Sequence, residues 1–299
     1  MAKVTARTAR AAIVYDFDGT LSPGHMQDKG LLAQLGVKDT KAFWKEVGAI
    51  KQRRDADEVL TYLHQIVETA KAANIKLTRE MLRECGASLD YFDGVESWFE
   101  MTNAFAAGIG LELEHYVVSA GNLEIIEGCS IFRYFKNVFA CKYEYDQTGA
   151  AHWPSIAVNY TTKTQFLFRI NKGIQNAWDS DAINAWMPEA DRPVPFTRMI
   201  FIGDGDTDIP SFKMMTSQGG AAIAVFDPAE WANPRHRDKA YKLIAESRVN
   251  FVAPADYSED SQLAVAVCGL LDRIARAERV NPKYFRDGIY ARESGDEER

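Results

Sequence analysis

The sequence predicts an α/β fold with a doubly wound parallel sheet and a smaller, all-helical domain inserted into it. Short apolar, β-branched runs alternate with stretches of helical periodicity, and the runs are continuously apolar, which is typical of strands buried on both faces. A long interval near the N-terminus contains no such run. The predicted strands are Ala11–Asp16, His115–Ser119, Arg198–Asp204, Ala221–Phe226 and Val249–Ala253.

The interval from Pro23 to Phe92 has apolar residues at helical spacing instead. Asp55 or Asp57 is the predicted N-cap of its longest helix, and Thr78 that of the next one. We therefore divide the chain into a core of residues 1–22 and 93–290, a helical cap of residues 23–92, and a disordered polar tail of residues 291–299.

Residues 138–160 predict a β-hairpin. The runs FACKYEYD and SIAVNY flank the turn-forming QTGAAHWP, which places Gly149 near the tip.

Composition excludes several classes of protein. Of 299 residues, 46% are hydrophobic and 26% charged, and 35 basic against 42 acidic residues give a net charge of −7. This acidic balance argues against non-specific nucleic-acid binding and leaves small molecules and divalent cations as partners. The four cysteines have no metal-binding spacing, which predicts reduced thiols in a cytoplasmic protein. No apolar stretch is long enough for a membrane span or a secretory signal, and composition does not predict an oligomeric state.

Two carboxylates end the first predicted strand. Asp16 and Asp18 are followed by Gly19, which allows a sharp exit from the strand. Like charges two residues apart are costly to desolvate, so the pair predicts either a bound cation or a division of acid and base roles. An ordinary Asp-Gly turn is the alternative interpretation.

A second acidic cluster ends the strand at Arg198–Asp204. Asp204, Asp206 and Asp208 precede a helix opened by Ile209 and Pro210, and the ends of parallel strands are where such sheets carry their sites. A calcium loop is excluded, because the twelfth position from Asp204 is a methionine instead of the required glutamate.

The strand at His115–Ser119 ends in a hydroxyl and small residues. Ser119, Ala120 and Gly121 precede a predicted helix, which is typical of an anion site. The alternative is a simple helix cap by Ser119 or Asn122.

Together these segments resemble the DxDGT, [ST]xG and GDxxxD motifs of the haloacid dehalogenase (HAD) superfamily, mostly Mg²⁺-dependent phosphohydrolases. The resemblance implies that Asp16 is the nucleophile and that Asp18 is the general acid and base. It further implies that Mg²⁺ is held by Asp16, the backbone carbonyl of Asp18 and Asp204, with Asp208 ordering its surroundings. The implied phosphate-binding residues are Thr20, Ser119, Ala120, Gly121 and a lysine.

Lys163 and Lys172 are the candidates for that lysine. The family places its lysine near the start of the helix, which favours Lys163. Lys172 precedes Gly173 and is typical of a cation at a helix C-terminus.

The resulting prediction is a phosphatase acting on a small phosphorylated metabolite. Asp18 separates the chain from the dehalogenase branch, which lacks this acid, and the hairpin and cap resemble the phosphoserine-phosphatase branch. That branch has an acid after its first motif for the substrate amine, whereas this chain reads LSPGHMQ. A phosphotransferase and a non-catalytic binding protein are the alternatives. The polar or aromatic cap residues that we considered as substrate contacts are His25, Trp44, Lys45, Arg53 and Arg54.

Overall fold

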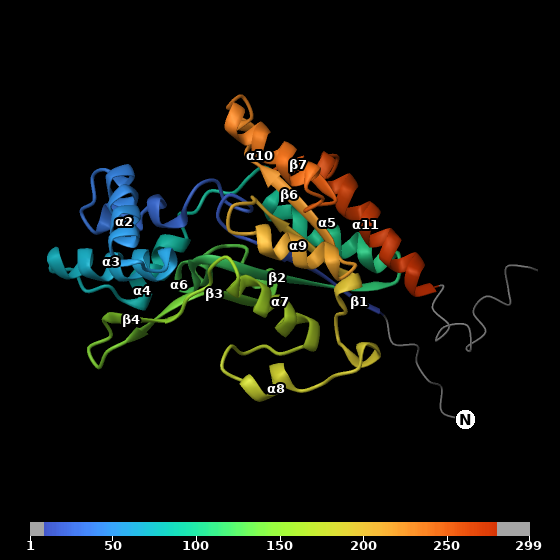
Figure 1. Ribbon diagram of the computed structural model, residues 1–299, viewed down its shortest axis with the longest axis horizontal. Coiled ribbons are helices and arrows are strands. Elements are labelled where there is room, and N and C mark those ends of the chain that lie inside the picture. Colours follow the sequence, from blue (N-terminus) through green and yellow to red (C-terminus); the bar gives the residue numbers. More distant parts are fainter. Residues whose placement is uncertain (1–8, 280–299) are drawn as a thin grey trace, which may run out of the picture.

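The computed structural model describes residues 9–279, so the predicted tail lies outside the described residues. Strands form a sheet in the order β4-β3-β2-β1-β5-β6-β7, in which β4 alone is antiparallel to its neighbour (Figure 1). The sheet confirms the predicted α/β class. The strands are β1 (Ala9–Tyr15), β2 (Leu111–Asn122), β3 (Phe135–Tyr145), β4 (Ala151–Ile156), β5 (Met199–Gly203), β6 (Ala221–Phe226) and β7 (Phe251–Pro254).

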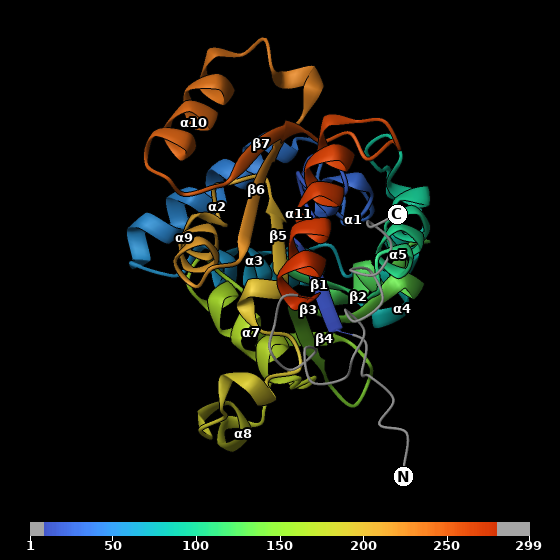
Figure 2. The same cartoon turned by 90° about the vertical axis from the view of Figure 1, so that its right-hand side faces the viewer.

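Helices cover both faces of the sheet (Figure 2). On one face lie α5 (Val95–Gly108) and α11 (Gln262–Arg279); on the other lie α7 (Thr162–Lys172), α9 (Ile209–Ser217) and α10 (Pro234–Ala245). The central strands are therefore buried on both sides, and every residue of β5 is buried. This double coverage explains why their sequences are continuously apolar.

The interval between β1 and α5 contains helices and no strand, as predicted. Its elements are η1 (Met26–Lys29), α1 (Leu31–Gln34), α2 (Thr40–Arg54), α3 (Glu58–Ala72) and α4 (Arg79–Gly86). Asp57 caps α3 by accepting from the Leu60 N–H at 2.9 Å, and Thr78 caps α4 by accepting from Met81 at 3.1 Å. Asp55 instead ends α2 in the left-handed conformation.

The end of this insertion packs closely against the core. Helix α4 lies on the short α6 (Leu123–Glu127), and a Cβ at Gly86 would overlap the Ile125 carbonyl oxygen. Arg79 reinforces the contact by donating to both carboxylate oxygens of Glu127, at 2.7 and 2.9 Å. The insertion therefore covers the β3–β4 end of the sheet (Figure 1), while the domain boundaries stay a prediction.

The predicted hairpin is present, but its second strand was misplaced. It begins at Ala151, which pairs with Tyr145, and ends at Ile156, so the chain that we predicted to be strand from 157 to 160 is not. Val158 turns inward there, where it is buried and donates its N–H to the Cys141 Sγ at 3.2 Å. The alternation of apolar and polar residues in the sequence cannot reveal this contact between Val158 and Cys141.

A segment that we did not predict connects α7 to β5. Buried Arg169 holds it by donating to the carbonyls of Asn176, Ala177 and Asp179 at 3.0–3.1 Å. The remaining short helices, some of which belong to this segment, are η2 (Phe132–Tyr134), α8 (Ser180–Asn184), η3 (Glu189–Asp191), η4 (Phe196–Arg198) and η5 (Pro228–Glu230). All four cysteines are free. None of the helices in the described part of the chain combines the length and apolar character that a bilayer crossing requires.

Candidate active site

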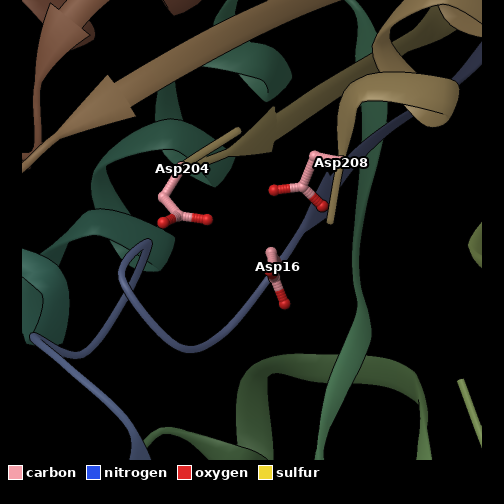
Figure 3. A group of neighbouring side chains, drawn as sticks. All are labelled: Asp16, Asp204 and Asp208. Carbon is pink, nitrogen blue, oxygen red and sulfur yellow. The ribbon is translucent and has the colours of Figure 1, made fainter. Parts of the chain in front are cut away.

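The site lies where β1 and β5 end side by side. The two strands are parallel neighbours, and the Asp16 N–H donates to the Ile202 carbonyl at 2.9 Å. The chain continues from β1 to α5 on one face of the sheet and from β5 to α9 on the other, and parallel sheets carry their sites at such a point. Asp16, Asp204 and Asp208 face one another there, with a carboxylate oxygen of each within 4.8 Å of the others (Figure 3).

A single buried lysine lies within this group. The Lys163 ammonium is 2.7 Å from the Asp16 Oδ2 and 2.7 Å from the Asp208 Oδ1, and it donates to the Thr207 hydroxyl at 2.9 Å. Burial opposes its charge, but the carboxylates of Asp16 and Asp208 outweigh that effect and raise the pKa of Lys163. Lys163 is therefore charged at neutral pH.

Lys172 lies elsewhere. Its ammonium donates to the carbonyls of Ile183 and Ala185, each at 2.6 Å, and so fastens the segment before β5. Of the two candidate lysines, Lys163 contacts the acidic group.

Asp16 is held at both carboxylate oxygens. Its Oδ1 accepts from the Phe17 N–H at 2.7 Å, while its Oδ2 faces Lys163. The carboxylate has little rotational freedom as a result.

Two glycines let the backbone approach the carboxylates. Gly19 has φ +71°, and a Cβ there would lie 2.8 Å from the Asp204 Oδ2. A Cβ at Gly203 would overlap the Asp208 carboxylate. Gly19 is thus required by its backbone angle and by packing, and Gly203 by packing.

Asp18 stands beside the acidic group, and its Oδ1 accepts the Met26 N–H at 3.0 Å. Burial and, next, repulsion by Asp16 raise the pKa of Asp18 well above its usual range. Burial also raises the pKa of Asp204, opposed by Lys239, and that of Asp208, opposed by Lys163. A protonated Asp18 can donate a proton near neutral pH.

The end of β2 shows no side-chain helix cap, which was the alternative interpretation for it. The helix that follows is only five residues long, and Asn122 forms no side-chain cap. The Ser119 Oγ instead accepts from the Gly121 N–H at 3.0 Å, and the Ala120 carbonyl accepts from the Tyr62 hydroxyl of α3. Buried Thr20 has an Oγ1 without a hydrogen-bond partner within the described chain. The phosphate-binding roles of these residues stay predictions.

The cap residues that we considered as substrate contacts are outside the acidic group. Trp44 donates its indole N–H to Asp28 at 2.9 Å and packs against the His25 ring, with 5.1 Å between the ring centroids. Lys45, Arg53 and Arg54 are exposed on α2. Met26, Thr207 and Lys239 were missed; of these, only Thr207 lies in a recognisable motif.

Comparison with known proteins bears on the fold. No family model matches the chain. A protein of Borreliella burgdorferi whose description assigns no activity is 26% identical over 279 residues, which cover 84% of this chain and 93% of that one.

Solved structures are similar across most of the chain. A HAD family hydrolase from Salmonella enterica serovar Typhi has a TM-score of 0.55 and 12% identity, covering 87% of this chain and 70% of that one. A substrate-bound phosphoserine phosphatase has a TM-score of 0.54 and 16% identity, and the match covers 87% of this chain and 99% of that one. A probable phosphoserine phosphatase from Vibrio cholerae has a TM-score of 0.56 and 14% identity, covering 91% and 67%.

The chain has the fold of these HAD-family structures. This agrees with the resemblance inferred from the motifs around Asp16 and Asp204. In the HAD fold of this chain, those motifs end the neighbouring strands β1 and β5.

Proposed function

We propose that this HAD-fold protein is a cytoplasmic, Mg²⁺-dependent phosphatase that hydrolyses a small phosphorylated metabolite through an aspartyl-phosphate. One observation carries the proposal: Asp16 lies in a group with Asp204, Asp208 and the buried Lys163, and both of its carboxylate oxygens are held. Phosphoryl transfer depends mainly on positioning and charge neutralisation, which this arrangement favours.

The donor set fits Mg²⁺. Three carboxylates face one another within 4.8 Å, and a single lysine in contact with two of them leaves an excess of negative charge. Mg²⁺ prefers carboxylate and carbonyl oxygens. We assign its binding to Asp16, Asp204 and the Asp18 carbonyl, with Asp208 supporting them. When bound, the ion would neutralise charge on the phosphoryl group.

The protein's residues would perform two displacements. An Asp16 oxygen attacks phosphorus, the bond from phosphorus to the leaving oxygen breaks, and Asp18 gives that oxygen a proton. Water then attacks the phosphorus of the aspartyl-phosphate, Asp18 takes its proton, and inorganic phosphate leaves with Asp16 restored. Lys163, with Thr20 and residues 119–121, would hold the phosphoryl oxygens.

The substrate is assigned only by class. Some of the similar structures are named as phosphoserine phosphatases. Residues 21–27 of this chain contain no acidic side chain that could bind the amine of phosphoserine, so we do not propose phosphoserine as the substrate. Adding glycerol and measuring new phosphoester would separate phosphotransfer from hydrolysis.

The test is hydrolysis of an aryl phosphate by the purified chain. We expect turnover with Mg²⁺, none in EDTA, and a loss of at least about a thousandfold in Asp16→Asn. Asp181→Asn, an exposed aspartate on α8, is the matched control and should keep full activity. Unchanged turnover in EDTA or in Asp16→Asn would refute the proposal.

A further inference from the structure

Helix α10 brings a second lysine to the rim of the acidic group. The helix lies in the connection from β6 to β7, beside both strands (Figure 2). The Lys239 Nζ is 3.0 Å from the Asp206 Oδ1 and 4.0 Å from the Asp204 Oδ2. Lys239 therefore lies between Asp204, which belongs to the acidic group, and Asp206, which is exposed to solvent.

The backbone is shaped to admit this side chain. Gly205 has φ +113°, and a Cβ there would lie 2.7 Å from the Lys239 Cε. The backbone angle requires a glycine, and the end of the Lys239 side chain occupies the space beside it. The side chain of Lys239 is 29% exposed, against 81% for Asp206. The lysine is thus held against the loop that carries Asp204.

Its charge has a direct consequence for a divalent cation. Any cation bound to Asp204 would be repelled by a second positive charge close to the same carboxylate. Asp206 is the nearer partner of Lys239 and draws the ammonium away from Asp204. Asp206 lies outside the group formed by Asp16, Asp204 and Asp208, so it can pair with the lysine without acting as a ligand.

We infer that Lys239 sets the Mg²⁺ affinity of the site by competing with the ion for Asp204, and that Asp206 limits this competition. The inference rests on the proposed function for the identity of the metal site. Lys239 is a positioning residue in this account, because it acts through Asp204. Weakened affinity would make the site responsive to the concentration of free Mg²⁺.

Two substitutions should act in opposite directions. Lys239→Met removes the competing charge and should tighten Mg²⁺ binding by roughly five- to tenfold. Asp206→Asn releases the ammonium toward Asp204 and should weaken binding by a similar factor. In the Lys239→Met background, the effect of Asp206→Asn should shrink, because the lysine that it restrains is gone.

The test is calorimetric titration of the full chain with Mg²⁺ alone, which needs no substrate. Lys242→Met, an exposed lysine on the same helix with no ion pair among residues 9–279, is the control for net charge and should leave the affinity unchanged.

Tighter binding in Lys239→Met but not in Lys242→Met, with the smaller Asp206→Asn effect in the double variant, supports the inference. Equal or weaker binding in Lys239→Met, or equal tightening in Lys242→Met, overturns it while leaving the phosphatase proposal intact. An absence of Mg²⁺ binding by the unmodified chain overturns both.

Discussion

The Lys163 ammonium lies 2.7 Å from the Asp16 carboxylate, and both side chains are buried where β1 and β5 end. Asp208 is at the same distance from the lysine on its other side. A buried cation shared by two carboxylates offsets their mutual repulsion, and removing it would leave buried acidic groups without their partner.

Replacing Lys163 should therefore damage both activity and stability. In Lys163→Met, we expect phosphatase activity to fall at least a hundredfold and the free energy of unfolding by roughly 3 kcal/mol, because buried carboxylates lose their cation. Enzyme assays and urea unfolding measure the two effects. Lys172→Met should keep its activity and lose only about 1–2 kcal/mol through two hydrogen bonds to carbonyls. Similar activities in the two variants would contradict the assignment of Lys163.

Gly19 offers a sharper test, because Gly24 provides its control. Both have a positive φ, of +71° and +74°, but a Cβ at Gly19 would press on Asp204 while one at Gly24 would meet nothing within 4 Å. Gly24→Ala should cost about 1 kcal/mol of stability, from backbone strain alone. Gly19→Ala should also weaken Mg²⁺ binding by at least about tenfold in calorimetry, because Asp204 must move. Equal Mg²⁺ affinities in the two variants would show that the contact is unimportant.

Sequence reasoning succeeded where a local pattern has one physical cause. The run at β6 was predicted to the residue, since a strand buried on both faces must be continuously apolar. The structure also brings Asp16, Asp204 and Lys163 into one group, as their places after strands and at a helix start indicated, while their roles stay predictions. The helix caps Asp57 and Thr78 are likewise local.

It failed where a distant partner decides the structure. Nothing near Lys239 in the sequence indicates that α10 will bring it to Asp206, and nothing near residue 158 indicates the bond to Cys141. A helix cap by Ser119 or Asn122 was the alternative to an anion site at the end of β2, but the Gly121 N–H donates to the Ser119 hydroxyl. Such contacts depend on packing between elements far apart in the chain.

His115 should make the protein sensitive to acid. The His115 Nε2 donates to the Asn103 side-chain oxygen at 3.2 Å, and the His115 Nδ1 accepts from the Tyr15 hydroxyl at 3.0 Å. The same hydroxyl accepts from the Trp98 indole N–H at 2.8 Å. This chain of hydrogen bonds requires a neutral imidazole, and burial lowers the pKa of His115 to about 3.

In the unfolded chain, His115 binds a proton with an ordinary pKa of about 6.5. The contribution of neutral His115 to the free energy of unfolding is therefore fully present above pH 6.5 and is lost as the pH falls toward 3. The loss should reach roughly 4 kcal/mol. Urea unfolding at several pH values should show a shallower dependence in His115→Gln, although this variant is less stable at neutral pH. His152→Gln, at an exposed position of β4, should keep the steep dependence. The same slope in His115→Gln as in the unmodified chain would refute this role.

The central claim is that the phosphoryl group passes through Asp16, and trapping it there is the most direct test. In Asp18→Asn, an aryl phosphate has a good leaving group and can still phosphorylate the enzyme, but water lacks its base. Rapid mixing with a ³²P-labelled aryl phosphate and Mg²⁺ should give a burst of about one aryl alcohol per chain. The label should be labile to hydroxylamine and map to the peptide containing Asp16. No burst, or a label on any other residue, would contradict the account.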